Sequence, residues 1–487
     1  MNNTSILAIS LTLMGSSALL AQKKPNVLFI MTDQQSYNMM SCMGNKSLST
    51  PNMDKIASMG YRFEKTYCAN PVCMPSRFSL LTGHYASEVG VKENTQNYNS
   101  AKVQEIISEG SLGAVFSKAG YETLYSGKTH LYGTQDVSQY GFALNNTNPY
   151  EGPAIFAEKV LAEIGKEAGE RPFLLFLSFM NPHDICYKAG FDPRFPDKLP
   201  QANVTETTRL LALQATLSEA EYRSQIPPRA TNLSPISDEV PEMVSMSSQW
   251  RSWDSAHWDL YNWMYHRLTE SVDAQIGRVL TALKNAGLEE TTIIVFTSDH
   301  GDMNGSHGLI LKNVMFEECQ RVPFIFAGKG IKSNYADKST LVCNGLDLLP
   351  TLCDLTGIES PDGIPGMSLK PYLSGIGKKT ARDYLITENY NAYQITDGRY
   401  KLTLYELPGN PETLTDIIAN PGETKNFSKD PAYAKIKAKL KKELMNHLSE
   451  RNLLPLPEDR TIENIRAIEK SKNAEKKKKK VEEAIEE

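Results

Sequence analysis

Short apolar runs alternate with longer helical patterns over most of the chain. The first run, 27–31, ends in the polar residues TDQQ, as a buried parallel strand does at its carboxyl end. Similar runs lie within 171–184, 291–302 and 321–328. Helical periodicity separates them, for example over 111–119 and 260–286. This alternation predicts an α/β fold, with a large, mostly parallel sheet sandwiched by helices.

Three of these runs end in side chains that can bind a metal ion. The pairs that follow them are Asp33-Gln34, His183-Asp184 and Asp299-His300. Because ligands of such sheets bind beyond the carboxyl ends of the strands, a site is expected at this edge. Asp33, Gln34, Asp299 and His300 suit a hard divalent cation, Ca²⁺ or Mg²⁺. Taken alone, SDHGD also fits an ordinary strand cap.

The pattern of predicted secondary structure changes near residue 385. Short segments with turn signals precede a basic amphipathic helix over 431–448, which predicts a smaller C-terminal α+β subdomain. The expected boundaries are 22–375 for the catalytic α/β domain, 376–460 for the subdomain and 461–487 for a charged tail. IPGMSLKPYLSG, at 364–375, is the expected linker. The Lys-rich tail is expected to be a solvated helix, with polyanion binding as the alternative.

The N-terminal segment has the pattern of a secretory signal peptide. An apolar stretch at 6–20 gives way to QKKPN, and cleavage is expected near Ala21, although the usual preceding basic residue is missing. The stretch is too short for a transmembrane span. We therefore expect an exported protein, periplasmic or secreted, with no integral membrane anchor. A buried N-terminal helix is the alternative.

Charge and cysteine content narrow the function further. A net charge of -5 and a pI near 6.0 exclude nucleic acid as the main partner and leave small or sugar-like substrates open. The seven cysteines leave one unpaired if the protein is exported and six of them pair, in any of about 15 ways. Free buried thiols are the alternative, and no pair has zinc-site spacing.

Cationic side chains accompany the predicted metal ligands. Lys128 and His130 follow an apolar run two residues apart, so on a strand they share a face. His183 and Lys312 add another imidazole and another ammonium. Each alone is ordinary, but cations that converge with a metal form a site for a tetrahedral oxyanion.

Several segments together resemble one enzyme family. CMPSRFSLLTG at 73–83 resembles the signature of the type I, formylglycine-dependent sulfatases of the alkaline-phosphatase-like superfamily. GYETLYSGKTHL resembles their second signature. PNVLFIMTDQQ, NPHD, the segment from SDHGD to RVPFIF, and ANPGETKNF also match in the family's order, from residue 25 to about 427. The resemblance implies a sulfuric ester hydrolase with an alkaline-phosphatase-like fold.

The resemblance also implies how Cys73 acts. A formylglycine-generating maturation enzyme reads Pro75, Ser76 and Arg77 and oxidises Cys73 to an aldehyde, whose hydrate is the nucleophile. One hydrate oxygen attacks sulfur, and the second then expels sulfate. A serine would instead be left with a stable ester.

Further roles are carried over from the family by position. The implied metal ligands are Asp33, Gln34, Asp299, His300 and modified Cys73, with Ca²⁺ preferred over Mg²⁺. Arg77 and Lys128 would stabilise the hydrate, His130 would take its second proton, and His183 and Lys312 would hold the sulfate. Asn94 and His307 are weaker substrate-binding candidates.

Three positions depart from the common family pattern: Thr129, Gln34, and His84, which stands where many members have arginine. Thr129 stands where many members have tryptophan, and on a strand it would point away from Lys128 and His130. Gln34, in place of a second aspartate, lowers the negative charge around the cation by one.

The expected activity is removal of sulfate from a carbohydrate, such as a glycosaminoglycan-derived saccharide. A phosphonate monoester or phosphodiester hydrolase of the same superfamily is the first alternative. The second is a non-catalytic sulfated-glycan-binding protein, against which the intact set of reactive residues argues. Four tryptophans, at 250, 253, 258 and 263, form either a sugar platform or, as we favour, part of the core.

Overall fold

The structure is a computed structural model that describes residues 23–94, 101–146, 148–166, 171–191, 205–233, 253–407 and 409–454. The predicted signal peptide, Trp250 and the charged tail lie outside these residues. Among the described residues, no helix combines the length and apolar character needed to cross a membrane.

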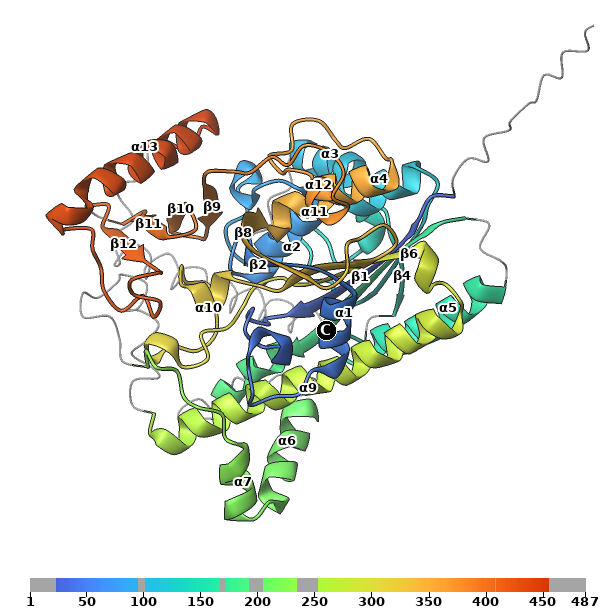
Figure 1. Ribbon diagram of the computed structural model, residues 1–487, viewed down its shortest axis with the longest axis horizontal. Coiled ribbons are helices and arrows are strands. Elements are labelled where there is room, and N and C mark those ends of the chain that lie inside the picture. The colour runs from blue at the N-terminus through green and yellow to red at the C-terminus, as the bar shows by residue number, and fades with distance from the viewer. Residues whose placement is uncertain are drawn as a thin grey trace, which may run out of the picture.

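An eight-stranded mixed sheet forms the centre of the main domain (Figure 1). Its strands, in spatial order, are β4 (Ala143–Asn146), β3 (Glu122–Gly127), β5 (Phe173–Pro182), β1 (Asn26–Asp33), β6 (Thr292–Ser298), β7 (Phe324–Gly328), β2 (Gly60–Tyr67) and β8 (Tyr335–Cys343). β1 pairs in parallel with both β5 and β6, whereas β7 is antiparallel to both of its neighbours. The sheet is therefore mostly parallel, as the sequence predicts.

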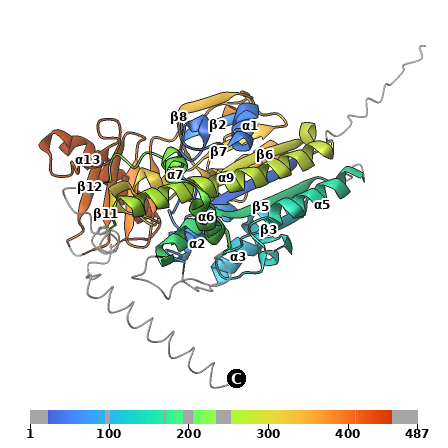
Figure 2. The ribbon, with the colours of Figure 1, turned by 90° about the horizontal axis from the view of Figure 1, so that it is seen from below.

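Helices cover both faces of this sheet. Successive side chains of β1 enter two different clusters: Val27, Phe29 and Met31 on one face, Leu28 and Ile30 on the other. This explains why the strand is apolar throughout instead of alternating. The first face is covered by α2 (Cys73–Thr82), α3 (Ala101–Gly110), α4 (Leu112–Lys118), α11 (Asn344–Thr356) and α12 (Lys370–Leu373). The second is covered by α1 (Pro51–Met59), α5 (Gly152–Lys166) and the long α9 (Ser255–Asn285) (Figure 2).

A smaller antiparallel sheet follows in the C-terminal subdomain, at the left of Figure 1. Its order is β12 (Glu412–Asp416), β11 (Tyr400–Tyr405), β10 (Ala392–Thr396) and β9 (Leu385–Glu388). Helix α13 (Ala434–Glu450) packs Leu440, Leu444 and Leu448 into the same cluster as these strands. Buried Lys401 ties the subdomain to α10 (Glu317–Gln320) through an ion pair of 3.1 Å with Glu317.

The predicted linker differs from the sequence-based expectation. The segment 364–375 packs into the main core, with Leu369 and Leu373 completely buried.

The tryptophans belong to the core, as the sequence analysis favours. Trp253, Trp258 and Trp263 are at most 7% exposed and belong to a core cluster with α6 (Thr205–Thr216). They are therefore core residues and form no sugar platform. Helix α7 (Glu219–Gln225) follows α6.

All seven cysteines, which lie within the described residues, are free thiols. Cys68, Cys73, Cys319, Cys343 and Cys353 are buried, so of the two alternatives the structure has that of buried thiols in a large core.

Candidate active site

The polar residues at the strand ends converge, as the sequence predicts. β5, β1 and β6 are neighbours, and their register places Asp33 beside Pro182 and Thr32 beside Ser298. Asp33, at the end of β1, therefore lies close to Asp299 and His300, which follow β6. These three residues are completely buried.

Cys73 is the first residue of α2, and every residue of this helix is buried. Val72 before it has no side chain that could cap the helix. Instead, Asn94 Oδ1 accepts a hydrogen bond of 2.9 Å from the Met74 backbone N–H. Asn94 thus satisfies one of the free N–H groups at the start of α2 and holds the turn that presents Cys73.

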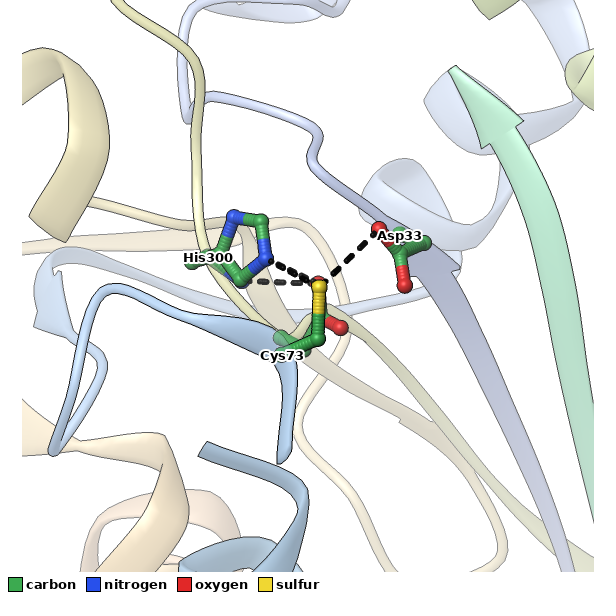
Figure 3. A group of neighbouring side chains, drawn as sticks. Asp33, Cys73 and His300 are labelled. Atoms are coloured by element: carbon green, nitrogen blue, oxygen red, sulfur yellow. Dashed lines mark hydrogen bonds and ion pairs between the residues drawn. The ribbon is translucent and has the colours of Figure 1, made fainter. Parts of the chain in front are cut away.

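Four side chains form a group that could hold a metal ion. The ligand atoms of Asp33, Cys73, Asp299 and His300 all lie within 4.8 Å of one another. Cys73 Sγ is 3.1 Å from His300 Nε2 and 3.9 Å from Asp33 Oδ1, and Figure 3 shows the sulfur between these two side chains. His300 Nδ1 lies 2.9 Å from the Gly301 carbonyl oxygen and donates to it, which leaves Nε2 facing the sulfur.

The donor set fits a hard divalent cation with one exception. Carboxylates and an imidazole suit such an ion, whereas the Cys73 sulfur is a soft donor. An oxygen in place of this sulfur would remove the mismatch, and conversion of Cys73 to an aldehyde hydrate provides one.

Arg77 contacts the carboxylates of Asp33 and Asp299 and fixes their orientation. Its guanidinium donates to Asp33 Oδ2 at 2.7 Å, to Asp299 Oδ2 at 3.0 Å and to Ser178 Oγ at 2.9 Å. The side chain is 1% exposed. An arginine can make this set of contacts because its donors lie in a rigid plane, which a lysine lacks.

Two lysines make the surroundings of Cys73 electropositive. Lys128 Nζ lies 2.6 Å from Asp33 Oδ2 and 4.0 Å from Cys73 Sγ. Lys312 Nζ hydrogen-bonds Gln34 Oε1 and lies 3.9 Å from Cys186 Sγ. Burial and Asp33 raise the pKa of the Cys73 thiol, but Lys128, Lys312 and His300 outweigh them, and this pKa lies well below its usual range. The site therefore stabilises a negative charge on Cys73 Sγ.

A cleft of about 420 Å³ opens over Cys73. It is lined by Cys73, Asn94, Gly127, Lys128, Thr129, His130, Gln135, Met180, His183 and Tyr187. Burial, Lys128 and Lys312 lower the pKa of His183 to about 3, so this imidazole is neutral at physiological pH.

The strand geometry expected for Lys128 to His130 is wrong. β3 ends at Gly127, and the chain then turns, with His130 at a φ of 44°. As a result Thr129 lines the same cleft instead of pointing away, and its hydroxyl donates to Gln135 Oε1 at 2.7 Å. Lys128 and His130 still face the cleft together, but a loop and not strand alternation places them there.

The two weaker candidates differ in their positions. Asn94 lines the cleft. His307 is completely buried, stacks on Phe316 at 4.0 Å and is absent from the described residues that line the cleft. Burial lowers the pKa of His307 to about 4, which fits a packed, neutral imidazole.

The structure adds residues that sequence reasoning missed. Gln34 Nε2 donates to Asp302 Oδ2 at 2.6 Å, and the Cys186 thiol donates to Gln34 Oε1 at 3.1 Å. Two tyrosines of α9 complete this network. The Tyr261 hydroxyl donates to the Asp302 carboxylate, and the Tyr265 hydroxyl donates to the Gln34 carbonyl oxygen. Asp302 stands within SDHGD and was visible as part of a motif, but nothing local in the sequence pairs it with Gln34.

Comparison with known proteins agrees with this geometry. The family model described as Sulfatase matches residues 25–358, and the model described as N-sulphoglucosamine sulphohydrolase, C-terminal, matches residues 305–450. A Delta 4,5-hexuronate-2-O-sulfatase of Bacteroides thetaiotaomicron is 32% identical over 461 residues, which cover 88% of this chain and 90% of that protein. An N-acetylglucosamine-6-O-sulfatase of the same organism is 28% identical, over 88% of this chain and 86% of its own length.

A solved structure described as a 2-O GAG sulfatase superposes with a TM-score of 0.73 at 29% identity, covering 88% of this chain and 93% of that one. The residues matched by the Sulfatase model, 25–358, contain the whole cluster around Cys73. The chain belongs to the sulfatase family of the alkaline-phosphatase-like superfamily and is a sulfuric ester hydrolase.

Proposed function

We propose that this protein is a formylglycine-dependent sulfatase that removes a sulfate ester from a glycosaminoglycan-derived saccharide with the help of a divalent cation. The observation that carries the proposal is the position of Cys73. Its sulfur lies between His300, Asp33 and Lys128, at the floor of the cleft, within 3.1 to 4.0 Å of each.

The cation would be held by Asp33, Asp299, His300 and the modified Cys73, and by Gln34, the further ligand that the family resemblance implies. Calcium is the preferred candidate and magnesium the less favoured one, as the family resemblance implies; the ligands would be mainly oxygens, which both ions take. When bound, the cation supplies Lewis-acid stabilisation of negative oxygen atoms.

Residues of the chain orient the ligands, supply positive charge and transfer protons. Arg77 keeps the carboxylates of Asp33 and Asp299 oriented, because it contacts both at hydrogen-bond distance. Lys128 and Lys312 supply positive charge for the nucleophile and the sulfate. His183, neutral before substrate binds, donates a hydrogen bond toward the sulfate or the departing oxygen. His130 lines the cleft in a position to accept a proton from the hydrate.

The relatives and the N-terminal segment indicate the substrate class and the location. The names of the two relatives refer to 2-O- and 6-O-sulfated sugars, and the N-terminal segment has the pattern of an export signal. We propose a sulfated mono- or oligosaccharide substrate, a formylglycine-generating maturation enzyme as partner, and an exported location, periplasmic or secreted.

The test uses protein co-expressed with a formylglycine-generating enzyme. The tryptic peptide 66–77 holds both Cys68 and Cys73, so alkylation after reduction should label one thiol instead of two. Sulfate release is then measured on defined sulfated mono- and disaccharides. Active protein with two labelled thiols would overturn the nucleophile assignment. Hydrolysis of a phosphonate monoester faster than of every sulfated sugar would favour the phosphonate hydrolase alternative.

A further inference from the structure

Gln34 has an unusual backbone conformation and is held at all of its polar atoms. Its φ is 68°, in the left-handed region that a non-glycine residue rarely adopts. The backbone N–H donates to Asp299 Oδ1 at 3.0 Å, and the carbonyl accepts from the Tyr265 hydroxyl at 2.6 Å. The side-chain oxygen accepts from Lys312 and Cys186, and the side-chain nitrogen donates to Asp302. Such a strained residue persists only where its surroundings fix it.

Asp302 makes a short contact with the side-chain nitrogen of Gln34. Its Oδ2 lies 2.6 Å from Gln34 Nε2, and the residue is completely buried. The other groups that contact its carboxylate are also donors: the Tyr261 hydroxyl at 3.1 Å and the Asn304 backbone N–H at 2.7 Å. The Asp302 side chain therefore accepts hydrogen bonds from three donors that belong to different parts of the chain.

The charges on the two sides of Gln34 determine which way its amide points. The Lys312 ammonium lies on one side and the Asp302 carboxylate on the other. A rotated amide would direct its NH₂ at the ammonium and its oxygen at the carboxylate, and both contacts would be repulsive. Asp302 thereby keeps Oε1 on the side of Lys312.

We propose that Asp302 is a positioning residue for the cation site, which acts through Gln34. By accepting the hydrogen bond from Gln34 Nε2, it directs Gln34 Oε1 toward the site. The inference rests on the proposed cation site.

Helix α9 supports this arrangement through two residues one turn apart. Tyr261 contacts Asp302, and Tyr265 contacts the Gln34 carbonyl and the Ser36 N–H. Both tyrosines are completely buried, so their hydroxyls are fixed by packing against the sheet. These two tyrosines of α9 therefore support the proposed cation site, although they are not among the residues that line the cleft.

The test measures Ca²⁺ binding directly, by calorimetric titration and by the Ca²⁺-dependent rise in Tm of the mature enzyme. Asp302→Asn should weaken Ca²⁺ binding by about tenfold to a hundredfold, as loss of such supporting groups does. Its sulfatase activity should recover at high Ca²⁺ with an unchanged KM. Glu318→Gln is the matched control: this carboxylate lies in the same region but contacts Asn232 instead of Gln34, and the variant should bind Ca²⁺ like the wild type.

A double-mutant cycle separates positioning from a direct effect of charge. If Asp302 acts through Gln34, Asp302→Asn should have no further effect on Ca²⁺ binding once Gln34→Ala is present. An undiminished effect in the Gln34→Ala background, or wild-type Ca²⁺ affinity in Asp302→Asn, would overturn the inference. If Asp302→Asn does not fold, Tyr261→Phe replaces it, with a smaller loss expected and the same cycle applied. Failure of the wild type itself to bind Ca²⁺ or other divalent cations would instead refute the cation site.

Discussion

Lys128 offers the sharpest quantitative test of the electrostatic mechanism. Its ammonium lies 4.0 Å from Cys73 Sγ and is 9% exposed. Opposite unit charges about 4 Å apart interact by about 4 kcal/mol at an effective dielectric constant of about 20. Lys128→Met removes this charge with little change in side-chain length, and it leaves the residues read by the maturation enzyme intact.

The full interaction converts to about a thousandfold in rate, because each factor of ten costs about 1.36 kcal/mol. The same ammonium is shared with Asp33 Oδ2, 2.6 Å away, which offsets part of its charge. We therefore expect kcat to fall by about a hundredfold to a thousandfold.

The assay is the initial rate of sulfate release from a sulfated disaccharide, normalised to the formylglycine content of each preparation. Lys370→Met is the matched control: Lys370 forms an ion pair with Asp354 at 2.9 Å outside the cleft, and its loss should leave kcat unchanged. A fully modified Lys128→Met enzyme that keeps more than about a tenth of wild-type kcat would refute the electrostatic argument.

Three further predictions concern the nucleophile, the cation and a buried carboxyl. Cys73→Ala should reduce sulfate release to background while Tm and the circular dichroism spectrum stay close to wild type; substantial turnover would exclude Cys73 as the nucleophile. Chelation with EDTA should abolish turnover and lower Tm, because Asp33 and Asp299 lose their bound cation, and added Ca²⁺ should restore both; activity that survives exhaustive chelation would contradict a cation requirement. Burial raises the pKa of Glu388 to about 7, so the folded protein keeps this proton to higher pH than the unfolded chain, and stability falls as pH rises from about 4.5 to 7. Glu388→Gln should remove about 3 kcal/mol of this fall, measured by urea unfolding at both pH values, and an identical pH dependence in the two proteins would disprove it.

The features that depend on short contiguous stretches are the ones the sequence predicts well. The run 27–31 is apolar at every position because the strand is buried on both faces, and this pattern is readable without a structure. The CMPSR segment is equally local, and it singles out Cys73 as the candidate nucleophile before any fold is known. The rule that ligands meet at the carboxyl ends of parallel strands then brings Asp33 and Asp299 together, although they lie far apart in the chain.

A local sequence pattern gives a wrong prediction where the backbone conformation changes within a few residues or where tertiary packing buries an apparent loop. Lys128 and His130 follow an apolar run and look like the end of a strand, but the positive φ of His130 turns the chain and brings Thr129 into the cleft. The segment 364–375 contains two prolines and two glycines and looks like a linker, yet its apolar side chains complete the main core. In both cases tertiary contacts outweigh local propensity.

By itself the sequence thus predicted the α/β architecture and singled out the candidate nucleophile and most of the charged groups of the site, because these follow from local patterns and motifs. The tertiary structure alone decided how those groups are held. The contact between Gln34 and Asp302 joins residues 268 positions apart, and Tyr261 reaches it only because α9 packs beneath the sheet. Contacts of this kind depend on the packing of elements that are distant in the chain, and no short stretch of sequence contains them.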